Sequence, residues 1–298
     1  MQINSAAGKI DIHEIGETLF HEHIICTSPE FQRVFSEWLP RKQVVDIAVS
    51  KIKYAAEKFG VKTIFDVTPL TLGRDIGLLK EVSEKSGVNI IPSTGFYCYE
   101  SFSLRKLSVP ALTKFLLTDI ENTGASLLKC AVDAAGLTPL AAKTLEVMSC
   151  VHKETNIPIY VHTHAASKTG IPALELLTGL GVPAHKIVFG HVSDANDITY
   201  PLELLKHNTF VSVDRIHQHN AQFILQLINA NYSDRIMVSH DHICCLDTIM
   251  ENPQANQKEP YGLDVVHGKI LPELRASGVD EKTVKQLTDA NIIRLFEK

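Results

Sequence analysis

Several features of membrane, secreted and nucleic-acid-binding proteins are missing from this sequence. No apolar segment approaches the roughly 18 residues that a helix needs to cross a bilayer. Residues 1–5 lack the basic and then apolar order of a secretory signal. Lysine and arginine form no run, and the net charge is −5. We therefore expect neither a nucleic-acid partner nor a membrane partner.

Cysteine is present but forms no recognisable framework. The six cysteines, at positions 26, 98, 130, 150, 244 and 245, show no CxxC spacing. This excludes a zinc knuckle and a disulfide scaffold as the organising feature of the chain. We expect reduced thiols and a cytoplasmic protein.

The composition is that of a globular protein with a large core: 45% of the 298 residues are hydrophobic and 21% are charged. Short β-branched runs alternate with amphipathic stretches along the chain. Strands are predicted at 18–23, 61–67, 88–94, 127–131, 157–162, 186–190, 210–214 and 235–239. Helices are predicted at 41–59, 74–86, 111–123, 139–155, 171–180, 199–207, 220–230, 262–276 and 281–296.

Eight strand–helix repeats predict an α/β fold of the (β/α)8 TIM-barrel kind. Parallel strands need long crossover connections, and a doubly wound open sheet usually has fewer strands. We expect one domain over residues 1–298, with residues 1–17 as an N-terminal cap in the form of a hairpin or lid at the barrel bottom. The irregular stretch 243–261 is predicted as a long loop after the eighth strand that shapes the substrate pocket.

Polar residues gather where the predicted strands end, which is where (β/α)8 barrels carry their active sites. His21 and His23 lie two residues apart, so on a strand they face the same side while Glu22 faces the other. A histidine pair alone is weak evidence for a metal. Three further groups follow later strands, however: His162 with His164, His191, and Asp241 between two histidines. Together they predict a divalent transition-metal site.

Lys129 is out of place in the predicted apolar strand 127–131. If its amine reacts with carbon dioxide, the resulting carbamate is an anion that can bridge two metal ions. The alternative is a lysine that extends towards solvent or pairs with a carboxylate such as Asp133.

Seven short motifs give the chain a family resemblance. They are 16–23 (GETLFHEH), 72–75 (LGRD), 93–97 (STGFY), 157–164 (IPIYVHTH), 169–170 (TG), 190–194 (GHVSD) and 239–241 (SHD). In these motifs the chain resembles the phosphotriesterase family of the amidohydrolase superfamily, which includes phosphotriesterase-like lactonases and phosphotriesterase homology proteins. The resemblance runs along nearly the whole chain and implies a TIM barrel of the metal-dependent hydrolase type.

The resemblance also implies a binuclear metal centre. By position, His21, His23 and Asp241 would bind a buried metal ion, and His162 and His191 a more exposed one. Carbamylated Lys129 and a hydroxide would bridge the two ions, with Asp241 accepting the proton. Zinc is expected first; cobalt, manganese and iron suit the same ligands. A homodimer is compatible with the family.

Two residues bear on the substrate. Tyr97 matches the tyrosine that the lactonase members place beside the metal centre, and Arg215 matches an arginine that follows their seventh strand. Both favour a lactone, such as an acyl-homoserine lactone. Tyr97 is alternatively an aromatic loop filler, and Arg215 a partner of Asp214 or Asp241. Residues 216–219 and the lack of tryptophan in 243–261 depart from the acyl-homoserine lactonase pattern.

We therefore expect a metal-dependent hydrolase of ester bonds, a lactonase with promiscuous organophosphate triesterase activity. Its partners would be small lactone, ester or phosphotriester substrates. One alternative is a hydrolase of phosphorylated sugar lactones or carboxylate esters, which would need more basic residues near the later strands than Arg215 and Lys258. An alternative of another class is a non-catalytic binding protein on the same scaffold, for which we would expect an incomplete ligand set.

Overall fold

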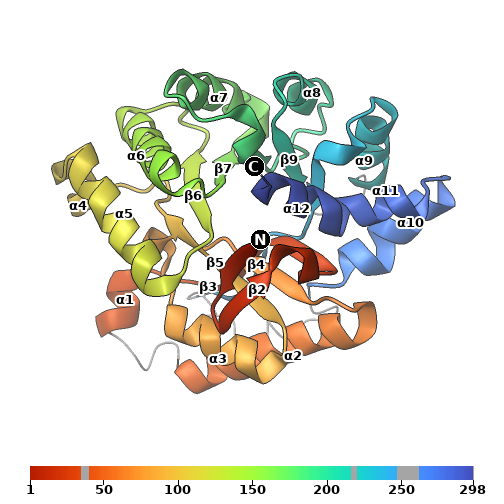
Figure 1. The fold of residues 1–298 in the computed structure, drawn as a ribbon, viewed down its shortest axis with the longest axis horizontal. Coiled ribbons are helices and arrows are strands. Elements are labelled where there is room, and N and C mark those ends of the chain that lie inside the picture. The colour runs from red at the N-terminus through yellow and green to blue at the C-terminus, as the bar shows by residue number, and fades with distance from the viewer. Residues whose placement is uncertain (35–39, 216–219, 247–261, 298) are drawn as a thin grey trace.

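The computed structural model describes residues 1–34, 40–215, 220–246 and 262–297. Their main feature is one curled sheet of parallel strands surrounded by helices (Figure 1). Its strand order is β10-β9-β8-β7-β6-β5-β4-β3-β11. The strands are β3 (Thr18–Cys26), β4 (Thr63–Asp66), β5 (Asn89–Gly95), β6 (Leu127–Val132), β7 (Ile159–Thr163), β8 (Ile187–Gly190), β9 (Phe210–Val213), β10 (Ile236–Val238) and β11 (His242–Leu246). The barrel-type α/β fold is confirmed.

The two ends of the sheet meet between β10 and β3. The backbone amide of Ser239 continues the pairing of β10 with β9 by donating to the carbonyl of Val213 at 3.2 Å. The amide of Asp241 then donates to the carbonyl of His21 on β3 at 3.0 Å. After Asp241 the chain continues as β11, whose residue His242 pairs with Glu22 of β3. The segment from β10 to β11 thus joins the last strand of the barrel to the first.

The prediction of a loop beginning at residue 243 is wrong for residues 243–246, which belong to β11. Asp241 has a φ of 55°, in the left-handed region that strands do not contain. This residue lies after the predicted eighth strand, 235–239, and before β11, where pairing with β9 has ended and pairing with β3 begins. The rest of the predicted loop, 247–261, lies outside the described residues.

The helices cover the outside of the sheet. They are α1 (Pro29–Val34), α2 (Arg41–Phe59), α3 (Ile76–Ser86), α4 (Phe102–Lys106), α5 (Val109–Thr123), α6 (Pro139–Thr155), α7 (Gly170–Gly179), α8 (Thr199–Leu205), α9 (Asn220–Asn229), α10 (Leu271–Ala276), α11 (Glu281–Lys285) and α12 (Asn291–Phe296). Gly60, Gly87 and Gly124 end α2, α3 and α5 in the left-handed conformation, as the sequence predicted. Asp280 caps α11, and π-helical turns at Val266–Ile270 and Gln286–Ala290 lead into α10 and α12.

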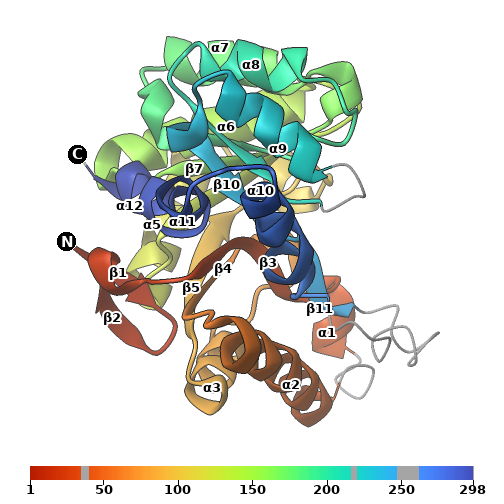
Figure 2. The ribbon, with the colours of Figure 1, turned by 90° about the vertical axis from the view of Figure 1, so that its right-hand side faces the viewer.

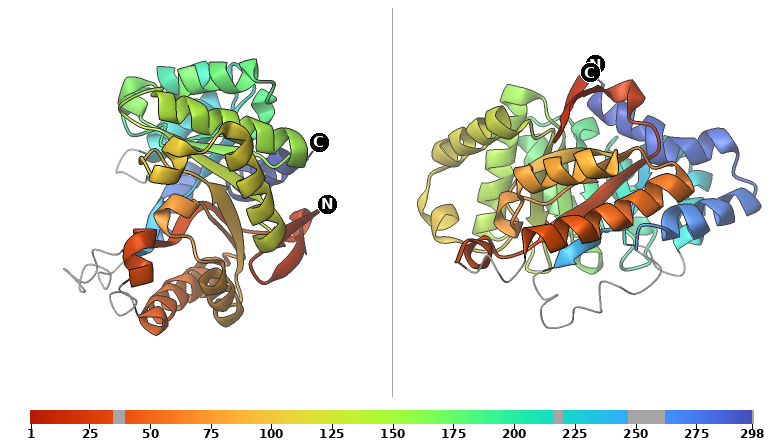
Figure 3. Two further views of the ribbon diagram at one scale, coloured as in Figure 1. Left: turned by 90° about the vertical axis from the view of Figure 1, so that its left-hand side faces the viewer. Right: turned by 90° about the horizontal axis from the view of Figure 1, so that it is seen from below.

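The N-terminal residues form an antiparallel hairpin of β1 (Gln2–Ser5) and β2 (Gly8–Asp11). Ile3, Ile12 and Ile15 are buried with residues from inside the barrel, including Phe20 and Phe65. The amide of Ala6 donates to the carbonyl of Ile90 at the start of β5. Figures 2 and 3 show both termini at this end of the molecule. The hairpin therefore lies at the N-terminal ends of the strands, away from the end where ligands are expected.

Most strands are buried on both faces, as parallel sheets covered by helices are. All nine residues of β3 are buried. One apolar cluster fills the barrel and others lie between the sheet and its helices. Within the described part of the chain, no helix is both long and apolar enough to cross a membrane.

Candidate metal centre

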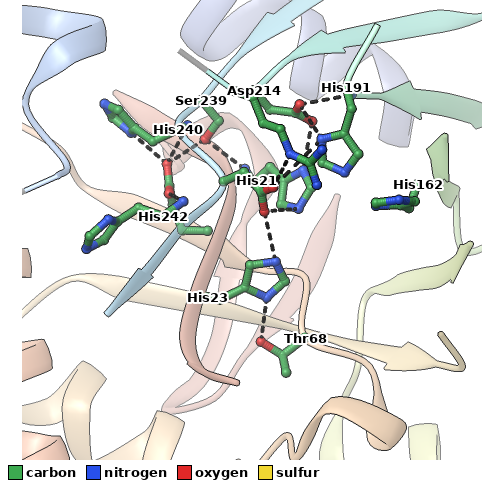
Figure 4. A network of polar contacts seen from close by, with 12 residues as sticks. His21, His23, Thr68, His162, His191, Asp214, Ser239, His240 and His242 are labelled. Atoms are coloured by element: carbon green, nitrogen blue, oxygen red, sulfur yellow. Dashed lines mark hydrogen bonds and ion pairs between the residues drawn. The ribbon is translucent and has the colours of Figure 1, made fainter. Parts of the chain in front are cut away.

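The predicted ligands come together at the C-terminal ends of the strands, and Figure 4 shows His21, His23, His162 and His191 among them. His21 and His23 belong to β3, Lys129 to β6 and His162 to β7. His191 directly follows β8, and Asp241 separates β10 from β11. Their side chains are 15% exposed or less, although the chain brings them from positions up to 220 residues apart.

The strongest convergence is on the carboxylate of Asp241. Its Oδ1 lies 3.1 Å from Nε2 of both His21 and His23. His191 approaches the other oxygen, with Nδ1 3.8 Å from Oδ2. His21, His191 and Asp241 each place one ligand atom within 4.8 Å of the others, a spacing that could hold a metal ion.

His162 lies beside this group without joining it as closely. Its ring centre is 4.4 Å from that of His191, in an edge-on arrangement. Its Nε2 is 3.3 Å from the Tyr97 hydroxyl and 3.8 Å from Oδ1 of Asp133. His164, on the same strand end, instead bonds Ser167 through Nδ1 at 2.9 Å.

Lys129 is almost fully buried and faces the centre. Its Nζ is 3.5 Å from Nε2 of His21 and 4.2 Å from the ring centre of Tyr160. Asp133, the alternative partner considered above, lies against His162 instead. Burial lowers the pKa of the Lys129 amine to about 8, so a larger share of it is neutral at neutral pH than for an exposed lysine.

Asp214 orients two of the histidines at once. Its Oδ2 lies 2.8 Å from Nδ1 of His21, and its Oδ1 lies 2.8 Å from Nδ1 of His191 (Figure 4). The Tyr160 hydroxyl also donates to Oδ2. A carboxylate that accepts from Nδ1 leaves Nε2 of each ring free to bind a metal.

On the other side of the centre, Thr68 supports His23 as Asp214 supports His21 and His191: its Oγ1 lies 2.9 Å from Nδ1 of His23. Sequence reasoning missed Asp214, Tyr160 and Thr68 as supporting residues. The signal for Asp214 was available, because a polar residue directly after a buried strand points to the same rim as the ligands.

The charges around the centre favour an ionised carboxylate. Burial opposes ionisation of Asp241, but His21 and His23 outweigh it and hold its pKa well below its usual range. Asp214 behaves in the same way, through His191 and His21. Burial and the neighbouring His191 lower the pKa of His162, which keeps its imidazole neutral and able to act as a ligand.

Comparison of the sequence with protein-family models identifies the family to which this site belongs. The model described as "Phosphotriesterase family" matches residues 1–296. The chain belongs to the phosphotriesterase family. Members of this family are binuclear metal-dependent hydrolases, so the expected family and the expected class of enzyme, a metal-dependent hydrolase of ester bonds, are confirmed.

Curated relatives of this phosphotriesterase-family chain cover almost its full length. An aryldialkylphosphatase of Saccharolobus solfataricus is 30% identical over 96% of this chain and 96% of its own. A phosphotriesterase homology protein of Mycobacterium tuberculosis is 29% identical over 100% of this chain and 98% of its own. A phospho-furanose lactonase of Mycoplasmopsis agalactiae is 25% identical over 96% of this chain and 88% of its own.

The two predicted substrate residues of this family member both reach the centre. The Tyr97 ring stacks edge-on against His162, with 5.1 Å between ring centres. Arg215 donates through Nε to Oδ2 of Asp241 at 2.9 Å and through Nη1 to Asp194 at 2.7 Å. Of the two alternative partners considered for Arg215, the structure selects Asp241.

A cavity of about 650 Å³ lies near the centre, lined by residues next to Tyr97 in the chain but not by Tyr97, Arg215 or the six candidate ligands. Tyr99 lines it and stacks against Tyr97 with 4.9 Å between ring centres. Most of the other lining residues are apolar: Cys26, Leu70, Leu72, Phe96, Leu104, Leu107, Leu112, Phe115 and Leu246. Its described charged residues are both acidic, Glu30 and Glu100.

Proposed function

We propose that this phosphotriesterase-family chain is a binuclear-metal lactonase with weaker activity on organophosphate triesters. The observation that carries the proposal is the convergence of His21, His23 and His191 on Asp241, with Lys129 and His162 beside them. All six predicted ligand positions hold residues that can bind a metal. A non-catalytic scaffold would have no need to keep such a set.

In this proposal His21, His23 and Asp241 would hold one ion, and His162 and His191 would hold the other. Lys129, once carbamylated, would offer an anionic oxygen donor to both. The donor set fits, because imidazole and carboxylate groups suit zinc, cobalt, manganese and iron, and zinc is our first expectation. Two such ions, when bound, supply a Lewis acid for the ester oxygen and a water of lowered pKa.

The chain's own residues would then position the substrate and move the proton. Asp241 is ionised and buried, so it can accept a proton from the attacking water. Arg215, bonded to Oδ2, holds the Asp241 carboxylate in place. The Tyr97 hydroxyl, 3.3 Å from Nε2 of His162, is placed to donate a hydrogen bond to the carbonyl or ring oxygen of a lactone.

The cavity supports a neutral, apolar substrate over a phosphorylated one. Glu30 and Glu100 would repel an anionic substrate. Arg215, a cation at the centre, is already paired with Asp241 and is therefore not available to bind a phosphate group. Lys258, the other basic residue considered, lies outside the described part. The name of the phospho-furanose lactonase keeps phosphorylated sugar lactones as the second substrate class to test.

The test is a substrate panel on metal-reconstituted protein. It includes aliphatic lactones of increasing chain length, a phosphorylated sugar lactone, carboxylate esters and a neutral aryl dialkyl phosphate. We expect lactone opening that a chelator abolishes and that zinc, cobalt or manganese restores. Fully metallated protein that opens no lactone of any length would contradict the lactonase assignment.

We also propose a cytoplasmic location. All six cysteines are free thiols in the structure, which supports a reducing compartment. Measuring the number of accessible and total thiols in protein purified from its host without reductant tests this. Oxidised pairs under those conditions would contradict it.

A further inference from the structure

Glu22 lies between His21 and His23 on β3, and its carboxylate is 1% exposed. It is not one of the candidate ligands, because it faces the opposite side of the strand. That side faces the turn 239–242, which joins β10 to β11. Figure 4 shows Ser239, His240 and His242 of this turn together, away from His162.

The turn saturates the Glu22 carboxylate with hydrogen bonds. Oε1 accepts from the Ser239 hydroxyl at 2.7 Å and from the His240 amide at 3.0 Å, and it lies 2.7 Å from Nδ1 of His240. Oε2 accepts from the His242 amide at 2.8 Å. The residues on both sides of Asp241 are therefore bound to one carboxylate.

Asp241 needs such support, because its φ of 55° is a conformation that residues other than glycine rarely adopt. A backbone conformation of this kind persists where its surroundings determine it from several sides. Two direct contacts between the turn and β3 complement Glu22. The Asp241 amide donates to the His21 carbonyl at 3.0 Å, and the His21 amide donates to Ser239 Oγ at 2.9 Å.

We propose that Glu22 is a positioning residue that sets Asp241 for metal binding. Through the turn, it fixes Oδ1 of Asp241 at 3.1 Å from Nε2 of both His21 and His23. One β3 segment thus supplies two ligands directly and places a third from the far end of the sheet. This inference rests on the proposed function, because it takes Asp241 as a metal ligand.

The test is Glu22→Gln, measured on metal-free protein titrated with Co²⁺. Glutamine has the same shape, but its amide group must face at least one N–H or O–H donor of the turn. We expect at least tenfold weaker binding of the tighter Co²⁺ equivalent and altered visible absorption bands of the Co²⁺ protein. With cobalt saturating, we expect a lower kcat and an unchanged KM, because the cavity is untouched.

The matched control is Glu17→Gln. Glu17 precedes the same strand and lies 2.8 Å from Nε2 of His267, but at the opposite end of the barrel. We expect this variant to lose stability and keep the Co²⁺ affinity and spectrum of the wild type. Glu22→Gln with wild-type affinity, spectrum and kcat would overturn the inference.

Two further outcomes are decided in the same experiment. If wild-type protein binds no divalent ion, the proposed function fails, whatever Glu22 does. If Glu22→Gln does not fold, Ser239→Ala takes its place, because it leaves the carboxylate and removes one donor to Glu22 together with the acceptor of the His21 amide. We expect a smaller change in the same direction, and a wild-type spectrum and affinity in Ser239→Ala would contradict the inference.

Discussion

Asp241 concentrates the chemistry of the site in one side chain. One of its oxygens faces two imidazoles and the other accepts from Arg215. The imidazoles hold its pKa well below the usual range, which favours the ionised carboxylate. The negative charge suits the group as a metal ligand, and its place among the candidate ligands suits it as the proton acceptor in the proposed reaction.

Replacing Asp241 with asparagine removes that charge at constant size. We expect kcat for lactone opening to fall by about 10² or more, the lower end of the range for losing a general base. Asp75→Asn is the control, because Asp75 caps α3 and an asparagine can still cap it. Steady-state kinetics at saturating metal decides the matter, and unchanged turnover would remove Asp241 from the mechanism.

Tyr97 is expected to act through its hydroxyl. Tyr97→Phe keeps the ring against His162 and should lower kcat/KM for lactones by roughly tenfold, the effect of one hydrogen bond of about 1.4 kcal/mol. Tyr99→Phe is the matched control, since Tyr99 stacks on Tyr97 and is 61% exposed. Equal kcat/KM values in the wild type and Tyr97→Phe would show that the hydroxyl has no role and that Tyr97 only fills space in the loop.

At the scale of elements, the candidate site lies at the strand ends. Its position there could be predicted from the sequence. The alternation of strands and helices, the glycines that end helices and the placement of His21, His23, His162, His191 and Asp241 on one rim are all local patterns. The structure places these residues as the patterns indicate. Their role as metal ligands stays a prediction until a metal is measured.

Other parts of the elements could not be predicted. β11 was missed because a polar triplet, 239–241, interrupts the run, and only the pairing with β3 shows that a strand resumes. Asp214 directly follows a buried strand, which places it on the rim, but its support of His21 and His191 was missed because those hydrogen bonds depend on tertiary packing. The same holds for Glu22, whose partners lie 217 to 220 residues further along the chain.

The end of β8 offers a test of the packing beneath the site. A Cβ on Gly190 would lie 2.2 Å from the Tyr160 hydroxyl, and Tyr160 is completely buried and bonded to Asp214. We expect Gly190→Ala to cost about 1–3 kcal/mol of unfolding free energy through overpacking, and to weaken metal binding through the displaced Asp214.

Gly179→Ala, at the end of α7, is the control for this change. A Cβ there meets nothing within 4 Å. We expect it to be neutral or to stabilise the protein by about 0.4–1 kcal/mol, because alanine lowers the entropy of the unfolded chain. Chemical denaturation measures both variants. Equal stabilities would show that Tyr160 is free to move.

At the scale of the whole molecule, the cavity beside Tyr97 should set substrate preference. Each methylene that it buries is worth about 0.8 kcal/mol. We therefore expect kcat/KM for aliphatic lactones to rise by up to roughly fourfold per methylene until the cavity is filled. A phosphorylated lactone of similar size should be a poorer substrate because of Glu30 and Glu100, and the reverse order would favour the phosphorylated class.

Domain number and oligomeric state are the remaining properties of the whole molecule. The family model spans residues 1–296 and the N-terminal hairpin packs on the barrel interior. A single domain over 1–298 and a homodimer both stay predictions. Size-exclusion chromatography with light scattering would measure the oligomeric state.

The central claim is that two metal ions, held by this rim, open a lactone. It is tested most directly by adding zinc or cobalt stepwise to metal-free protein and measuring lactone hydrolysis at each step. The account predicts activity that rises with added metal and saturates at two equivalents per chain. Hydrolysis that does not depend on metal, or none at full metal occupancy, would contradict it.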